Sequence, residues 1–172
     1  MKKAATVALS AAMLAGTAIA PALAATDGSV GSSSTGTSTI TAFVGSLVRV
    51  SAVDDLDLGN WSGSGDLVTS DDVCVWTTTG GYNVTATGNG GGGSDFELSN
   101  GATGTLAYSV KWGDSAGAAT DSLTTGTTSG SQFSGAATTD CGGGSSLTAS
   151  VQVEIVSADL AAAESGSYTG VL

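Results

Sequence analysis

SLTASVQVEIV, residues 146–156, has the clearest hydropathy pattern in this chain. Polar and apolar side chains alternate from Ser146 to Ile155. Side chains along a β-strand point alternately to its two faces, so the pattern predicts a strand with one face in a core and the other in water. The apolar face holds Leu147, Ala149, Val151, Val153 and Ile155. We expect other segments to supply strands that cover this face.

Several other segments alternate in the same way. Strands are predicted over residues 39–53, with a bend at Gly45-Ser46, and over 73–78, 81–87, 96–98 and 105–112. Gly80-Gly81 predicts a hairpin turn between two of these strands, and Asn100-Gly101 predicts another turn. Residues 116–139 are expected to be a long loop with one short strand. One or two helical turns are expected over 157–164, and a final strand begins at 166–172.

About seven short strands separated by turn signals predict an all-β chain, and more specifically an antiparallel immunoglobulin-like β-sandwich. A closed barrel is the alternative. The core is expected to consist mainly of Val, Leu, Ala and Ile, with Trp76 or Trp112 as its largest member.

Residues 1–24 have the three parts of a secretory signal peptide. Two lysines precede an apolar stretch over residues 4–20, and a small-x-small motif at 22–24 predicts cleavage between Ala24 and Ala25. A transmembrane anchor is the alternative, but no charged stop-transfer segment follows. The mature chain is expected to be exported to the periplasm, then to the cell surface or the outside, with no membrane span after signal removal.

The chain is strongly acidic, with four Lys and Arg residues against fifteen Asp and Glu and a formal net charge of −11. Removal of the two lysines of the signal peptide would take this charge to −13 and leave only Arg49 and Lys111 as cations. Phosphate backbones and anionic lipid surfaces repel such a chain. We therefore expect no nucleic-acid partner.

Cys74 and Cys141 are the two cysteines, 67 positions apart. In an exported protein such a pair is expected to form a disulfide. The chain has no histidine, which removes Ser-His-Asp and Cys-His nucleophilic sites and histidine metal ligands. We expect no enzyme activity and no cofactor.

Two further features resemble functional motifs without matching them. Residues 90–94 are glycine-rich but lack the lysine of a phosphate loop, so a linker is expected. Acidic residues cluster at 54–57 and 71–72, where a calcium site or a glycosidase carboxylate pair is conceivable, but no calcium-loop spacing is present. Exposed acidic pairs are expected by chance in a chain this acidic, so no metal site is predicted.

Four short segments together resemble bacterial pilin-type domains, in particular the spore coat protein U group, which includes the archaic chaperone–usher pilins. Leu56-Asp57-Leu58-Gly59 is similar to the "Leu-x-Phe/Leu-Gly" step of that family, and Gly166-Ser167-Tyr168-Thr169 is similar to its closing "Gly-x-Tyr-Thr" step. The segments are VSAVDDLDLGNW (50–61), GGYNVTATG (80–88), LAYSVKW (106–112) and SGSYTGVL (165–172).

The resemblance implies a structural subunit with an incomplete immunoglobulin-like fold that lacks its last strand. A periplasmic chaperone would fill the groove, and after passage through an outer-membrane usher the N-terminal strand of a like subunit would replace it. The family chains continue for several apolar residues after the Tyr-Thr step, whereas this chain stops at Leu172.

A donor strand should alternate large apolar residues ahead of the domain. Residues 25–38 are expected to be a flexible Gly/Ser/Thr segment with Val30 as its one large apolar side chain. The candidate donor residues are therefore Ile40, Ala42 and Val44, at the start of a domain spanning 39–172, although they also fit the first strand of that domain.

Two functions follow from these expectations. The first is a secreted structural subunit of a bacterial surface assembly, pilus-like or coat-like, joined by strand donation. The second is a self-complete β-sandwich that binds a carbohydrate or a surface ligand, through Trp61 and the glycine-rich loops.

Overall fold

The computed structural model describes residues 25–90 and 95–172. The expected signal peptide and most of the glycine-rich run lie outside these residues, and so does Ala24. The chain divides into two compact units, Met1–Phe43 and Val44–Leu172. In the first unit, Thr26 and Thr37 form an isolated antiparallel bridge in which each N–H donates to the other carbonyl oxygen at 3.0 Å.

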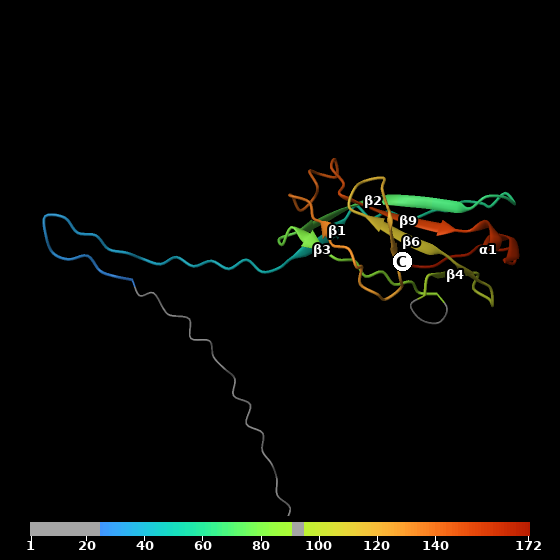
Figure 1. Cartoon of the computed structure of the whole chain (residues 1–172), viewed down its shortest axis with the longest axis horizontal. Coiled ribbons are helices and arrows are strands. Elements are labelled where there is room, and N and C mark those ends of the chain that lie inside the picture. Colours follow the sequence, from blue (N-terminus) through green and yellow to red (C-terminus); the bar gives the residue numbers. More distant parts are fainter. Residues whose placement is uncertain (1–24, 91–94) are drawn as a thin grey trace, which may run out of the picture. The chain divides into compact units, whose positions relative to one another are not determined.

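The second unit contains a five-stranded antiparallel sheet in the order β1-β2-β9-β6-β7 (Figure 1). Two two-stranded antiparallel sheets, β3-β8 and β4-β5, and the short helix α1 complete the described elements. The coarse prediction of an all-β antiparallel chain is confirmed. The bounds are β1 (Val48–Ser51), β2 (Leu67–Thr77), β3 (Gly81–Tyr82), β4 (Glu97–Ser99), β5 (Thr105–Ala107), β6 (Ser109–Gly113), β7 (Asp121–Leu123), β8 (Phe133–Ser134), β9 (Ala149–Ile155) and α1 (Ser157–Ala162).

The strand predicted from the clearest hydropathy pattern is β9, the central strand of the large sheet. It pairs with β2 on one side and β6 on the other, so that Val153 lies opposite both Thr69 and Val110. The apolar residues from Ala149 to Ile155 are buried, while Gln152 and Glu154 on the other face are partly exposed. The core cluster consists of Val73, Val75, Leu106, Tyr108, Val110, Trp112, Phe133, Ala149, Val151, Val153 and Ile155.

Trp112 is the largest member of this core, with 8% of its surface exposed. Its ring lies edge-on to Tyr82, with centroids 6.4 Å apart, and its Nε1–H donates to the Tyr82 hydroxyl at 3.3 Å. The other candidate, Trp76, is outside the core because it lies between two core-facing residues of β2, Val75 and Thr77, and therefore on the opposite face.

Residues 105–112 form two strands instead of the single predicted one. β5 pairs with β4, whereas β6 pairs with β9 and β7, so the chain changes sheets at Tyr108. The Tyr108 N–H donates to the Phe96 carbonyl oxygen at 2.9 Å, one hydrogen bond beyond the end of the β4–β5 pairing. The predicted alternation survives the change of partner, because Leu106, Tyr108, Val110 and Trp112 are all buried.

The predicted strand over residues 39–53 is wrong in extent, since only Val48–Ser51 is a strand. The strand predicted at 73–78 is also wrong in extent, because β2 begins at Leu67. β2 is extended by pairing with the central strand β9 over residues 67–72, of which only Leu67 and Val68 are apolar. Backbone hydrogen bonding to a neighbour therefore decides this strand more than its own pattern does.

The hairpin predicted at Gly80-Gly81 is wrong. β3, which is shorter than the predicted 81–87, pairs with β8 and not with β2, so the turn connects two different sheets. Residues 116–139 contain two short strands, β7 and β8, instead of one. At the C-terminus, Thr169 forms only a single bridge, to Ser99.

Cys74 and Cys141 are joined in a disulfide, as expected from the sequence, and both are buried. Cys74 lies on the face of β2 opposite to the core. The segment that carries Cys141 reaches β2 through two backbone bonds, from Ala136 N–H to the Val75 carbonyl oxygen and from Thr148 N–H to that of Val73. Within the described residues, no helix has the length and apolar content needed to cross a bilayer.

Candidate functional site

Strand β1 lies at one edge of the large sheet. Within residues 25–90 and 95–172, β2 is the only strand that pairs with it, from Val48↔Thr77 to Ser51↔Cys74. The free edge of such a strand presents backbone N–H and C=O groups to any strand that approaches it. β1 is therefore a place where a further strand can join the sheet.

The apolar side chains of β1 face the core side of the sheet but are not covered. Val48 lies opposite Thr77 and Val50 lies opposite Val75, and residues directly opposite each other in an antiparallel pair share a face. Thr77 and Val75 are buried, with 8% and 1% of their surfaces exposed, whereas Val48 and Val50 are 65% and 53% exposed. The side chains that pack on the core side of β2 therefore do not cover β1.

Other apolar side chains that flank β1 in the sequence are also exposed. Val44, Leu47 and Val53 are 76%, 58% and 65% exposed. Val48 and Val50, which share the core-side face of β1, form what we call the β1 strip. Exposed apolar side chains on one face of an edge strand are a candidate site of protein–protein contact.

The candidate donor residues precede the strip in the sequence. Ile40 is 94% exposed and Ala42 is also exposed, and both belong to the first unit, while Val44 belongs to the second. None of the three lies in a strand. The structure thus leaves their alternating apolar side chains uncovered. The neighbouring Phe43, 92% exposed, was not singled out in the sequence because it falls on the opposite parity.

Residues of the two family-like motifs have structural roles. Leu56, Leu58 and Tyr168 pack against the core cluster as partly buried residues. The Asp57 carboxylate accepts a hydrogen bond from the Gly59 N–H at 2.8 Å, and Gly59 has a φ of +70°, a conformation that favours glycine. The Tyr168 hydroxyl donates to the Glu164 carbonyl oxygen at 3.0 Å. These residues therefore contribute to the packing and the local turns of the domain.

The acidic residues singled out in the sequence accept hydrogen bonds from backbone N–H groups. Asp71 accepts from the Asp54 N–H at 2.9 Å, and Asp72 accepts from the Gly117 N–H at 2.7 Å. Within the described residues, no three acidic, cysteine or histidine side chains are grouped so that they could hold a metal ion. Trp61 is partly buried and its Nε1–H donates to the Gly65 carbonyl oxygen at 2.8 Å, so its polar atom is already used.

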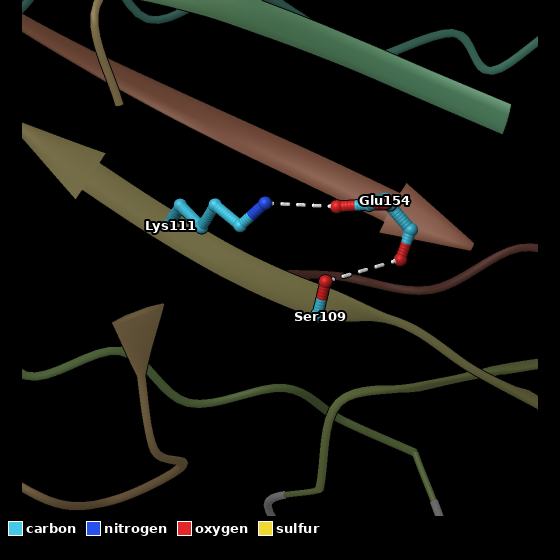
Figure 2. A network of polar contacts seen from close by, with 3 residues as sticks. All are labelled: Ser109, Lys111 and Glu154. Atoms are coloured by element: carbon cyan, nitrogen blue, oxygen red, sulfur yellow. Dashed lines mark hydrogen bonds and ion pairs between the residues drawn. The ribbon is translucent and has the colours of Figure 1, made fainter. Parts of the chain in front are cut away.

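The polar cluster in Figure 2 lies on the face of the large sheet opposite to the core. The Lys111 ammonium is 2.9 Å from a carboxylate oxygen of Glu154, and the Ser109 hydroxyl donates to the Glu154 backbone carbonyl at 3.4 Å. The Lys111 and Glu154 side chains are 33% and 24% exposed. A pair with this much solvent contact links β6 to β9 weakly, and it is no catalytic arrangement.

Comparison with protein-family models, with curated proteins and with solved structures finds no match to this chain. The β1 strip is therefore the candidate functional site of the second unit, and the uncharged apolar segment 39–44 is considered separately.

Proposed function

We propose that this chain is an exported structural subunit of a bacterial surface assembly, pilus-like or coat-like, whose copies join by β-strand donation. The domain would be an incomplete immunoglobulin-like β-sandwich of the type seen in spore coat protein U and the archaic chaperone–usher pilins. The observation that carries this proposal is the exposure of Val48 and Val50 on the core side of the sheet.

The β1 strip would act as the acceptor. A strand laid along the free edge of β1 gains backbone hydrogen bonds, and its alternate side chains can cover Val48 and Val50. Burial of an exposed valine side chain contributes roughly 1.5–3 kcal/mol, so closure of the strip gives a substantial driving force for association.

The donor would be residues 39–44 of another copy. Ile40, Ala42 and Val44 alternate and are exposed, which is the pattern that an edge strand with an apolar strip requires. Residues 28–48 contain no charged side chain, although the chain as a whole carries a net charge of −11. The donor can therefore approach an acidic neighbour without adding a charge to the interface.

The remaining partners follow from the family resemblance. A periplasmic chaperone would cover the β1 strip before assembly, and an outer-membrane usher would bring subunits together. In this role the chain has no enzymatic activity and binds no nucleic acid. Deletion of residues 25–44 should abolish polymer formation and leave a domain that still binds its chaperone.

Paired point variants test donor and acceptor separately. Ile40→Asp should disable the donor and Val50→Asp the acceptor, while Val30→Asp serves as a control because Val30 is fully exposed in the same unit as Ile40. Each disabled chain alone should stay monomeric in light scattering after size exclusion, and a mixture of the two should form dimers. Circular dichroism should show that all three variants keep their strands.

Normal polymers from the Ile40→Asp chain would show that the donor is assigned wrongly. A wild-type chain that remains a stable monomer without any chaperone would favour the self-complete binding domain instead.

A further inference from the structure

Strand β1 carries a positive charge on the face of the sheet opposite to the core. Arg49 stands between Val48 and Val50 in the sequence and lies opposite Trp76 of β2. Because successive side chains of a strand point to opposite faces, Arg49 is on the outer face and the two valines are on the core side. Arg49 and Lys111 are the only Lys or Arg residues in the described part of the chain.

The two cations differ in their surroundings. Lys111 is paired with Glu154 at 2.9 Å, whereas Arg49 forms no ion pair with any carboxylate of residues 25–90 and 95–172. Arg49 is also exposed. A chain with fifteen acidic residues thus leaves an accessible and unpaired positive charge on its edge strand.

The pairing of β1 with β2 fixes which backbone groups of β1 face the free edge. The Thr78 N–H donates to the Leu47 carbonyl oxygen at 3.0 Å, so Leu47 turns its backbone groups toward β2. In an antiparallel pair this direction alternates along the strand, so Arg49 also turns its backbone groups toward β2. The N–H and C=O groups of Val48 and Val50 therefore point to the free edge.

An antiparallel strand added at this edge would place three consecutive residues in defined surroundings. Its residues opposite Val48 and Val50 would form the hydrogen-bonded pairs, and their side chains would cover the β1 strip on the core side. The residue between them would face Arg49 on the outer side. A carboxylate matches an exposed guanidinium in charge and in hydrogen-bonding geometry, so the edge suits an apolar–acidic–apolar sequence.

We propose that the β1 edge binds an extended segment of a partner protein in which Asp or Glu stands between two apolar residues, with its carboxylate paired to Arg49. Segment 39–44 of a like copy contains no acidic residue, so the acidic segment belongs to a partner that covers the strip before a like copy does. This inference rests on the proposed acceptor role of the β1 strip. It adds the strand chemistry that the acceptor selects.

A charge on an edge strand can also serve only to prevent unwanted pairing between edges. In that role Arg49 would repel the Arg49 of a second copy, but it would not select a ligand. The two roles therefore differ in what they predict for the binding of short peptides.

The test titrates three short peptides into the isotope-labelled full chain and follows the amide signals of Val48 and Val50 by NMR. Each peptide has two valines within a Ser/Thr sequence, and the residue between the valines is Glu, Gln or Lys. The salt concentration is about 0.15 M, at which charges more than about 8 Å apart are largely screened. Lys111→Gln is the matched control for Arg49→Gln, because Lys111 lies on β6, three strands away, and already has a carboxylate partner.

The Glu peptide is expected to bind about 2- to 5-fold more tightly than the Gln peptide, and the Lys peptide more weakly than both. Arg49→Gln should remove the preference for Glu, whereas Lys111→Gln should keep it. A Glu preference that survives Arg49→Gln overturns the proposal, and so do equal affinities for the three peptides in the parent chain, which is the result expected if Arg49 only guards the edge.

The comparison of peptides on the parent chain needs no variant, so it stays decisive even if Arg49→Gln lowers stability. A parent chain whose Val48 and Val50 signals respond to none of the peptides shows that β1 is no acceptor, and it overturns the proposed function together with this inference. Binding without a charge preference overturns this inference alone.

Discussion

Removal of the disulfide by the double substitution Cys74→Ala/Cys141→Ala should lower the free energy of unfolding by about 4 kcal/mol. The bond joins residues 67 positions apart. In the chain-entropy view, a cross-link over such a loop restricts the unfolded ensemble far more than the folded state. Both cysteines are buried, so the substitution also removes some packing, which acts in the same direction.

The fold itself should survive this change at room temperature. The segment that carries Cys141 keeps its two backbone hydrogen bonds to β2, from Ala136 to Val75 and from Thr148 to Val73. The pairing of β1 with β2 does not involve the sulfur atoms. We therefore expect a weakened domain with unchanged far-ultraviolet circular dichroism, and no loss of the β1 strip.

Urea unfolding followed by tryptophan fluorescence measures the effect. The double variant should show a lower midpoint and a slightly larger m-value, because its unfolded chain is less compact than the cross-linked one. The oxidised parent chain, unfolded and then reduced, provides the matched control with the natural residues. A decrease of less than about 1 kcal/mol in both the variant and the reduced chain would refute the entropic reasoning.

Three further predictions concern the stability of the domain. Ser150→Ala should raise the free energy of unfolding, measured by urea titration, by about 1 kcal/mol. The reason is that the Ser150 hydroxyl is buried without a hydrogen-bond partner among the described residues. A destabilised variant would contradict this. Gly113→Ala should lower the free energy of unfolding by at least about 2 kcal/mol, because a Cβ there would lie 1.7 Å from the Ala118 carbonyl oxygen. Gly130→Ala is the control and should change this free energy little, because a Cβ there meets nothing within 4 Å. Burial raises the pKa of Tyr82 above 10.0; the Trp112 hydrogen bond opposes this rise, and the negative charge of Asp114 adds to it. Burial also raises the pKa of Tyr108. The folded state therefore retains these protons longer than the unfolded state, so stability should be complete below pH 10.0 and fall as the pH rises above it. Tyr82→Phe should reduce the difference between the urea midpoints measured below and above pH 10.0.

Much of the core could be predicted from the sequence because it depends on alternation alone. β9 and the buried residues from Leu106 to Trp112 lie where the apolar parity places them. Parity is a local property, and it holds whichever strand becomes the neighbour. The pairing partners were not predictable in this way, as shown by the change of sheets at Tyr108 and by β3, which pairs with the distant β8.

The candidate site was only half visible in the sequence. The apolar pattern of Ile40, Ala42 and Val44 could be noted, yet the same pattern also fits an ordinary first strand. The acceptor could not be recognised from the sequence, because Val48 and Val50 have the pattern of core residues in that strand. Their exposure depends on where the covering layer ends, which no local pattern records.

The sequence by itself determined which residues can face a core, that the chain is all-β, and that two cysteines are available to cross-link it. The tertiary structure alone decided which strands are neighbours, that β1 is left at an edge, and that Val48 and Val50 on it are exposed. The physical reason is that side-chain alternation follows from the geometry of a single strand. Exposure and pairing depend instead on segments far apart in the chain, which compete for the same backbone groups and the same apolar surface.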